Sequence, residues 1–83
     1  MVICENWAVC LERAAAFFTS QPEATSEGNS FRWGNCRITL TAQTGQMLGR
    51  FPIARTEVRI EGPEAEARAV YHRFYLQFLS AGG

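Results

Sequence analysis

The strongest constraint on the fold is an alternation of apolar and polar side chains between residues 31 and 43. Apolar residues occupy every second position on both sides of the Gly34-Asn35 dipeptide, which favours a two-residue β-hairpin turn. This turn places Trp33 opposite Cys36 and directs the apolar side chains to one face. The pattern therefore predicts an antiparallel hairpin with one buried face.

The segment that follows is expected to extend the same sheet. A second tight turn at Thr44-Gly45 would place Ala42 opposite Met47 and keep the apolar residues of 47–51 on the buried face. Pro52 has no N–H group to donate to a strand ladder, so the strand is expected to end there. We therefore expect a third strand that pairs with the second.

Residues 55–61 form another alternating segment. Its outward side chains are Arg and Glu, which can form ion pairs with neighbouring strands on the solvent face. We expect Arg50 to lie opposite Glu57. The inward set is Thr56, Val58 and Ile60. The segment is thus predicted to be a half-buried last strand.

Two segments have helical spacing. From residue 3 to residue 19, apolar side chains recur at steps of three and four, as in an amphipathic helix. A second helix is predicted from Pro63 to Leu79, because Pro suits the first helical position and the acidic residues that follow suit the helix dipole. The polar stretch at residues 20–30 has no periodicity and is predicted to be an exposed loop.

These elements predict an α+β fold. Both helices and the sheet each have one apolar face, and two layers bury all three faces. We expect a two-layer sandwich, in which an antiparallel β-meander of three to four strands carries the N-terminal and the C-terminal helix on one face. A chain of 83 residues supports one core, so residues 1–83 are predicted to form a single domain.

The charge balance argues against several classes of partner. Eight Arg balance eight Glu, and a formal net charge of zero gives no field that would attract nucleic acid or an acidic membrane. The sequence has neither an apolar run of about 18 residues nor a secretory leader, so we expect a cytoplasmic protein with no membrane partner. The absence of Lys and Asp suggests a GC-rich bacterial genome.

Three cysteines and the single His72 are the candidates for thiol or metal chemistry. Structural zinc sites use closely spaced Cys pairs, and Cys4 and Cys10 are too far apart for one, so we expect no metal and no cofactor. A catalytic thiolate must be exposed and must have a neighbouring base. Cys36 and His72 are the candidate pair, but the patterns place Cys36 inward and His72 outward. We therefore expect reduced thiols that react slowly.

The last two residues of the sequence are Gly82 and Gly83. This dipeptide resembles the C-terminal diglycine of ubiquitin-like sulfur carriers, which is adenylated and thiocarboxylated. The resemblance implies a β-grasp fold that begins with a β-hairpin and extends its tail from a final strand. The predicted element order instead begins and ends with a helix. The alternative is that the diglycine ends the second helix.

The second helix has more apolar surface than its core stripe requires. Leu76 and Leu79 project away from that stripe, near His72 and Tyr75. Contiguous exposed apolar side chains often mark an interaction surface. These four residues are therefore a candidate interface for a second copy or for an unidentified protein.

We interpret the chain as a small bacterial cytosolic module without catalytic activity that binds another protein or itself as a homodimer. One alternative is a small thiol enzyme or a diglycine sulfur carrier. Another is a domain that binds a small ligand or an anion, with Arg37, Arg50 and Arg59 on the open face of the sheet as anion ligands. The open face has no outward aromatic residues for stacking on bases, so we do not expect a nucleic-acid partner.

Overall fold

The computed structural model describes residues 1–43, 47–52 and 54–79. None of the helices in these ranges is long and apolar enough to cross a membrane. The elements, in chain order, are β1 (Val2–Trp7), α1 (Leu11–Ser20), β2 (Ala24–Glu27), β3 (Ser30–Trp33), β4 (Cys36–Gln43), β5 (Met47–Leu48), β6 (Phe51–Pro52), β7 (Arg55–Glu61) and α2 (Glu64–Leu79).

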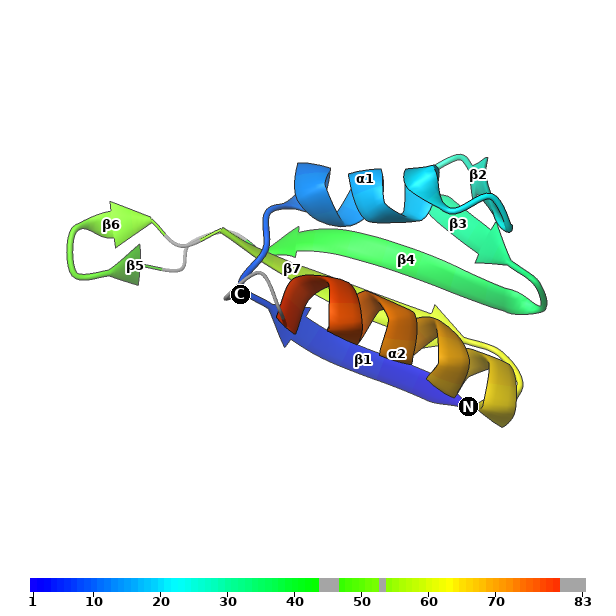
Figure 1. Ribbon diagram of the computed structural model, residues 1–83. Coiled ribbons are helices and arrows are strands. Elements are labelled where there is room, and N and C mark those ends of the chain that lie inside the picture. The colour runs from blue at the N-terminus through cyan, green and yellow to red at the C-terminus, as the bar shows by residue number, and fades with distance from the viewer. Residues whose placement is uncertain (44–46, 53, 80–83) are drawn as a thin grey trace.

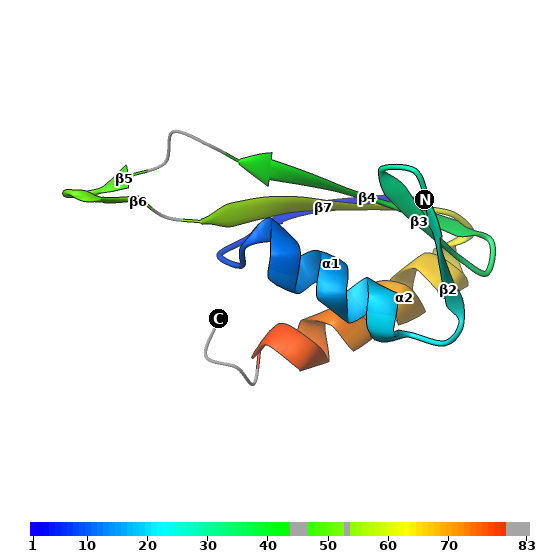
Figure 2. The same ribbon diagram turned by 90° about the horizontal axis from the view of Figure 1, so that it is seen from above.

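Five strands form one sheet in the order β1-β7-β4-β3-β2. Each pair of neighbours is antiparallel. Both helices cover the same face of this sheet, and the other face carries no helix (Figure 2). The predicted two-layer α+β fold is therefore confirmed, although the sheet has one strand more than expected.

The hairpin at Gly34-Asn35 is confirmed, with Trp33 opposite Cys36. Gly34 has a φ of 62°, a conformation that favours glycine in a tight hairpin turn. The inward set of the last strand is confirmed as well, because Thr56, Val58 and Ile60 are all fully buried. In these segments the alternation of period two determined both the element and its buried face.

The helix predicted from residue 3 to residue 19 is wrong in its first part. The chain there forms β1, an edge strand whose Ile3 lies opposite Ile60 and whose Trp7 lies opposite Thr56 of β7. The helix α1 begins only at Leu11. Ile3 and Trp7 are four residues apart, a spacing that fits one face of a strand as well as one face of a helix. Pairing with β7 therefore decides the structure of this segment.

The loop predicted at residues 20–30 is also corrected. Within it, Ala24–Glu27 form β2, which pairs with β3 so that Ala24 lies opposite Trp33. Three of the four β2 residues are exposed, so burial imposes no apolar alternation on them. The backbone ladder with β3 therefore makes this segment a strand.

The third strand is not where the sequence predicted it. The turn residues 44–46 lie outside the described residues. Met47–Leu48 pair with Phe51–Pro52 instead of with β4, and Ala42 lies opposite Thr56 of β7. The two short strands form an arm, defined here as β5 and β6 with their connecting turn, that projects from the body (Figure 1).

The predicted pairing of Arg50 with Glu57 is wrong, because Arg50 belongs to the turn of the arm. Glu57 lies opposite Thr41 of β4. Its carboxylate accepts hydrogen bonds from Gln43 Nε2 at 3.4 Å and from Cys4 Sγ at 3.3 Å. Thus the open face of the sheet has a local polar network in place of the expected ion pair.

The helix α2 follows Pro63, as the sequence predicted. Its predicted core stripe is largely confirmed, with Tyr71 only half-buried. The residues 80–83, expected to end the helix, lie outside the described residues. The buried residues of α2 are Ala67, Val70, Phe74 and Phe78.

Aromatic rings join the two helices to the sheet, and Phe74 lies at the centre. Its ring stacks on Phe18 of α1 with a centroid separation of 5.6 Å and an interplanar angle of 8°. It also makes edge contacts with Trp7 at 5.2 Å and with Phe17 at 5.6 Å. Since Phe74 and Phe18 are fully buried, this cluster fixes how α1 and α2 pack on the sheet.

Candidate interaction surface

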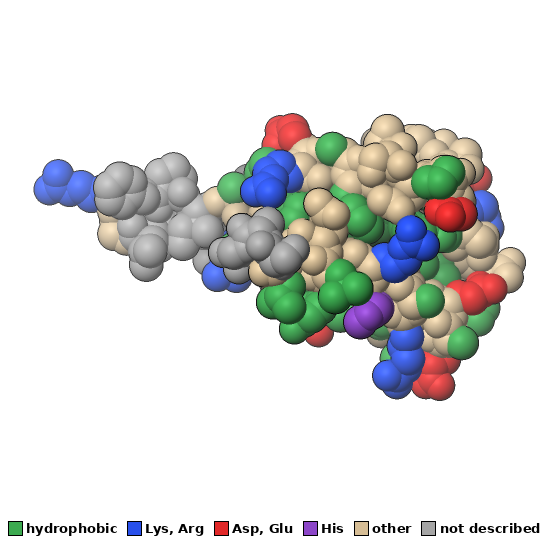
Figure 3. All heavy atoms as spheres, in the orientation of Figure 1, with side chains coloured by type: hydrophobic (Ala, Val, Ile, Leu, Met, Phe, Trp, Pro, Cys, Tyr) green, Lys and Arg blue, Asp and Glu red, His purple; other side chains and the backbone are tan. Residues whose placement is uncertain are grey.

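The C-terminal half of α2 exposes apolar side chains, as the helical spacing predicted. Leu76 is 54% exposed, Leu79 is 52% exposed and Tyr75 is 37% exposed. His72 is exposed on the same helix. We call these four residues the α2 surface. Figure 3 shows hydrophobic side chains gathered beside the single His on this face of the molecule.

Aromatic packing supports the α2 surface from beneath. The Tyr75 ring lies edge-on to Trp7 of β1, with 5.8 Å between centroids, and Tyr71 lies 6.3 Å from the same indole. Burial raises the pKa of the Tyr71 hydroxyl, and the negative charge of Glu5 raises it further. The surface therefore has a fixed aromatic base on β1 and exposed aliphatic side chains above it.

The three arginines predicted to bind an anion do not converge. Arg37 and Arg59 lie on the open face of the sheet, where Arg37 is opposite Glu61. Arg59 Nε donates to the Glu61 carboxylate at 3.2 Å, so its charge is already paired. Arg50 lies in the arm. Arg37 also lies opposite Arg32, whose guanidinium pairs with Glu27 at 3.3 Å. Within the described residues, the three predicted arginines therefore do not form one anion site.

The structure separates the environments of the two candidate catalytic residues. Cys36 is only 1% exposed at the start of β4, whereas His72 lies on the exposed side of α2. Desolvation raises the pKa of the Cys36 thiol, and the negative charge of Glu66 adds to this effect. A raised pKa keeps the sulfur protonated at neutral pH, which does not suit a nucleophile.

The other two thiols lie apart from Cys36. Cys4 is exposed on β1, and a hydrogen bond from its thiol to Glu57 raises its pKa. Cys10 is half-buried at the N-cap position of α1. Within the described residues, no three His, Cys, Asp or Glu side chains group closely enough to hold a metal ion.

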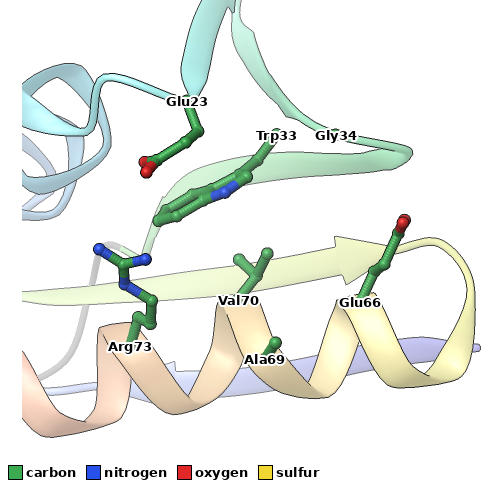
Figure 4. Close-up of a pocket in the computed structure, with 7 residues that line it drawn as sticks. All are labelled: Glu23, Trp33, Gly34, Glu66, Ala69, Val70 and Arg73. Atoms are coloured by element: carbon green, nitrogen blue, oxygen red, sulfur yellow. The ribbon is translucent and has the colours of Figure 1, made fainter.

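A pocket of about 390 Å³ lies between α2 and the β3–β4 hairpin. Figure 4 shows the Trp33 indole between Glu23 and Arg73. The Arg73 guanidinium lies 5.3 Å from the centre of the Trp33 ring and donates to Gln21 Oε1 at 3.3 Å. The indole face is thus already occupied by a cation from the same chain.

The residues of this pocket were not identified from the sequence. They come from the α1–β2 connection, the β3–β4 hairpin and α2, and no local spacing connects these segments. Trp33 was expected to be buried in the core because of its inward position, but it is only half-buried. The pocket lining consists of Glu23, Trp33, Gly34, Glu66, Ala69, Val70 and Arg73.

The fold and surface define a small α+β domain whose two helices cover one sheet face and whose second helix exposes an apolar end. Residues 9–83 match the family model described as archaeal MoaD-like protein. The match covers most of the chain, which therefore belongs to the archaeal MoaD-like protein family. Comparison with curated proteins and with solved structures gives no significant match.

Proposed function

We propose that this MoaD-like chain is a non-catalytic module that self-associates through the α2 surface. The observation that supports this most directly is the exposure of two neighbouring leucines, Leu76 and Leu79, each more than half accessible to solvent. Full burial of a Leu side chain contributes about 1.5–3 kcal/mol. Covering both would be a substantial gain for a domain this small.

The setting of the α2 surface favours a protein partner. Tyr and Trp are enriched at the centre of protein interfaces, where apolar side chains are buried on binding. Tyr75 fits this role because it packs on Trp7 while keeping part of its ring accessible. The thiol environments described above give little support to a thiol enzyme.

The test is a charge placed on the α2 surface. The Leu79→Glu variant should reduce self-association, because an interface would have to bury an unpaired carboxylate. Gln77→Glu adds the same charge to an exposed position of the same helix, on the side that faces Arg13 of α1, and is the matched control. Light scattering at several concentrations should show weaker association for Leu79→Glu and parent-like association for Gln77→Glu.

Equal association of both variants with the parent would refute self-association through this surface. If the parent itself stays monomeric at every concentration, then only the binding of a different protein would remain. Denaturant melts of both variants verify that each is folded under the conditions of the measurement.

A sulfur carrier is the second candidate, because the family match extends through Gly82 and Gly83. The geometry favours it less, since the last described element before the diglycine is the helix α2. Mass spectrometry of the chain purified from its native cells tests this candidate. Replacement of a C-terminal carboxylate oxygen by sulfur would support the carrier, and an unmodified terminus under conditions of active sulfur transfer would argue against it.

A further inference from the structure

The strand β4 is longer than its partner β3, which leaves part of one edge free. Along β7, the pairing of β4 runs from Arg37 to Gln43. Along β3, it runs only from Cys36 to Thr39. Among the described residues, the segment 40–43 therefore has a neighbouring strand on one side only. Backbone groups along this side can accept a further strand.

An apolar groove of about 560 Å³ lies beside this free edge. Leu11 and Ala15 of α1 line one side of it, and Phe31 and Leu40 contribute apolar surface from the sheet. The Gly28-Asn29 turn of the β2–β3 hairpin also lines it. A free strand edge beside apolar pockets is the arrangement that binds an added β-strand, because the backbone supplies affinity and the pockets select side chains.

The arm supplies strands that belong to no larger sheet. Its strands β5 and β6 pair with each other in a separate two-stranded sheet and project beyond the body (Figures 1 and 2). An isolated two-stranded hairpin is at best marginally stable in water. All the strand residues of this arm are apolar, namely Met47, Leu48, Phe51 and Pro52.

The arm leaves the body at the end of the free edge. Gln43 and Arg55 lie directly opposite each other, and residues 47–52 of the arm belong to the chain between them. The arm therefore continues away from the edge of its own β4, but a two-fold axis near this point would bring the arm of a second copy along that edge. The same two-fold rotation places the arm of the first copy along the β4 edge of the second copy.

The sequence pattern supports the arm of a second copy as the strand that pairs with this edge. The alternation of residues 40–43 and 47–51 is in phase for pairing, with Ala42 opposite Met47, although the structure places β5 elsewhere. An exchange between copies would form this pairing between two chains, although it is not formed within one. Neither the free segment nor β5 contains a charged residue that would oppose pairing.

We propose that the arm of a second copy adds β5 to the free edge of β4, with the two arms exchanged reciprocally in a homodimer. This inference rests on the proposed self-association. It adds a second contact between the two copies, besides the α2 surface. Each groove is incomplete in a single chain and is filled by the arm of the other copy.

A charge in the groove tests the proposal in the full-length protein. Ala15→Arg places a long cation in the groove, where the arm would dock. Ala16→Arg is the matched control, because Ala16 is exposed next to Arg13 on another side of α1. Sedimentation equilibrium should show the dimer dissociation constant raised about tenfold or more by Ala15→Arg and nearly unchanged by Ala16→Arg.

Removal of the arm is the second test. Because Gln43 and Arg55 are directly paired, residues 44–54 can be replaced by Asn-Gly, a dipeptide that suits a two-residue hairpin turn. This variant should keep the circular dichroism spectrum of a folded α+β domain and should be monomeric at concentrations where the parent is dimeric.

The outcomes separate this inference from the proposed function. If the arm-deleted variant remains as dimeric as the parent while Leu79→Glu dissociates, then the arm exchange is wrong and the α2 interface stands. If the arm deletion and Ala15→Arg dissociate the dimer but Leu79→Glu does not, then the arm exchange stands alone. A parent that is monomeric at every concentration overturns the arm exchange.

Discussion

The Thr56 hydroxyl donates a hydrogen bond of 2.7 Å to the carbonyl oxygen of Val9. Thr56 is fully buried in β7, and Val9 lies in the connection between β1 and α1. The bond satisfies a buried backbone acceptor where the chain changes from strand to helix. It therefore fixes the entry of α1 over the sheet.

The Thr56→Val variant should lower the free energy of unfolding by about 1–3 kcal/mol, because it keeps the shape of the side chain but leaves the Val9 carbonyl unsatisfied. Thr25→Val is the control, since Thr25 is exposed on the edge strand β2, and its change should stay within about 0.5 kcal/mol. Urea melts of both variants measure the difference. Equal stabilities would show that the hydrogen bond does not contribute.

Gly62 marks a close approach between the β7–α2 connection and β4. A Cβ atom at this position would lie 2.7 Å from Cys36 Sγ and 3.0 Å from the carbonyl oxygen of Asn35. Gly62→Ala should therefore destabilise the fold by about 1–3 kcal/mol through overpacking. A thermal melt measures this, and an unchanged melting temperature would mean that the connection relaxes freely.

The stability should also depend on the ionisation of Cys36. Its pKa is raised in the folded state, first by desolvation and then by Glu66. The unfolded chain therefore loses this proton at a lower pH than the folded protein does. The Cys36 contribution is fully present below the unfolded pKa of about 8.5 and is lost as pH rises through the higher folded pKa.

Denaturant melts between neutral and alkaline pH check this expectation. The loss of stability above about pH 8.5 should be smaller in Cys36→Ala than in the parent. Cys4→Ala is the comparison. Because this variant keeps Cys36, it should retain the loss of stability at alkaline pH that the ionisation of Cys36 causes. A parent-like pH profile for Cys36→Ala would contradict the role assigned to desolvation.

Much of the fold could be predicted from the sequence, because several segments carry a local pattern that only one structure satisfies. The turn at Gly34-Asn35 and the alternation of residues 55–61 specify both the strands and their buried faces. Helix α2 was predictable for the same reason, since Pro63 and a continuous apolar stripe define its start and its buried side.

The errors occur where local patterns are ambiguous. Ile3 and Trp7 satisfy both helical and strand periodicity, and only the distant partner strand β7 resolves the choice. Strand β2 is largely polar and lies at the sheet edge, so its sequence carries no apolar alternation. In both cases backbone pairing with another segment overrides the local signal.

The candidate surfaces differ in how well they could be foreseen. The outward direction of Leu76 and Leu79 follows from helical geometry alone, and the structure agrees with it. The free edge of β4 was not foreseen, because the sequence favoured an intrachain pairing of residues 47–51 with that edge. The free edge exists because β3 begins at Ser30, opposite Thr39, while β4 continues to Gln43, and this difference is a tertiary property.

Sedimentation velocity of the unmodified protein over a wide concentration range tests the central proposal of self-association most directly. The chain has a mass of 9.3 kDa. We predict a concentration-dependent shift from this mass to about twice this mass, as expected for a reversible homodimer. A single species of 9.3 kDa at every concentration would contradict the proposed self-association and the arm exchange together.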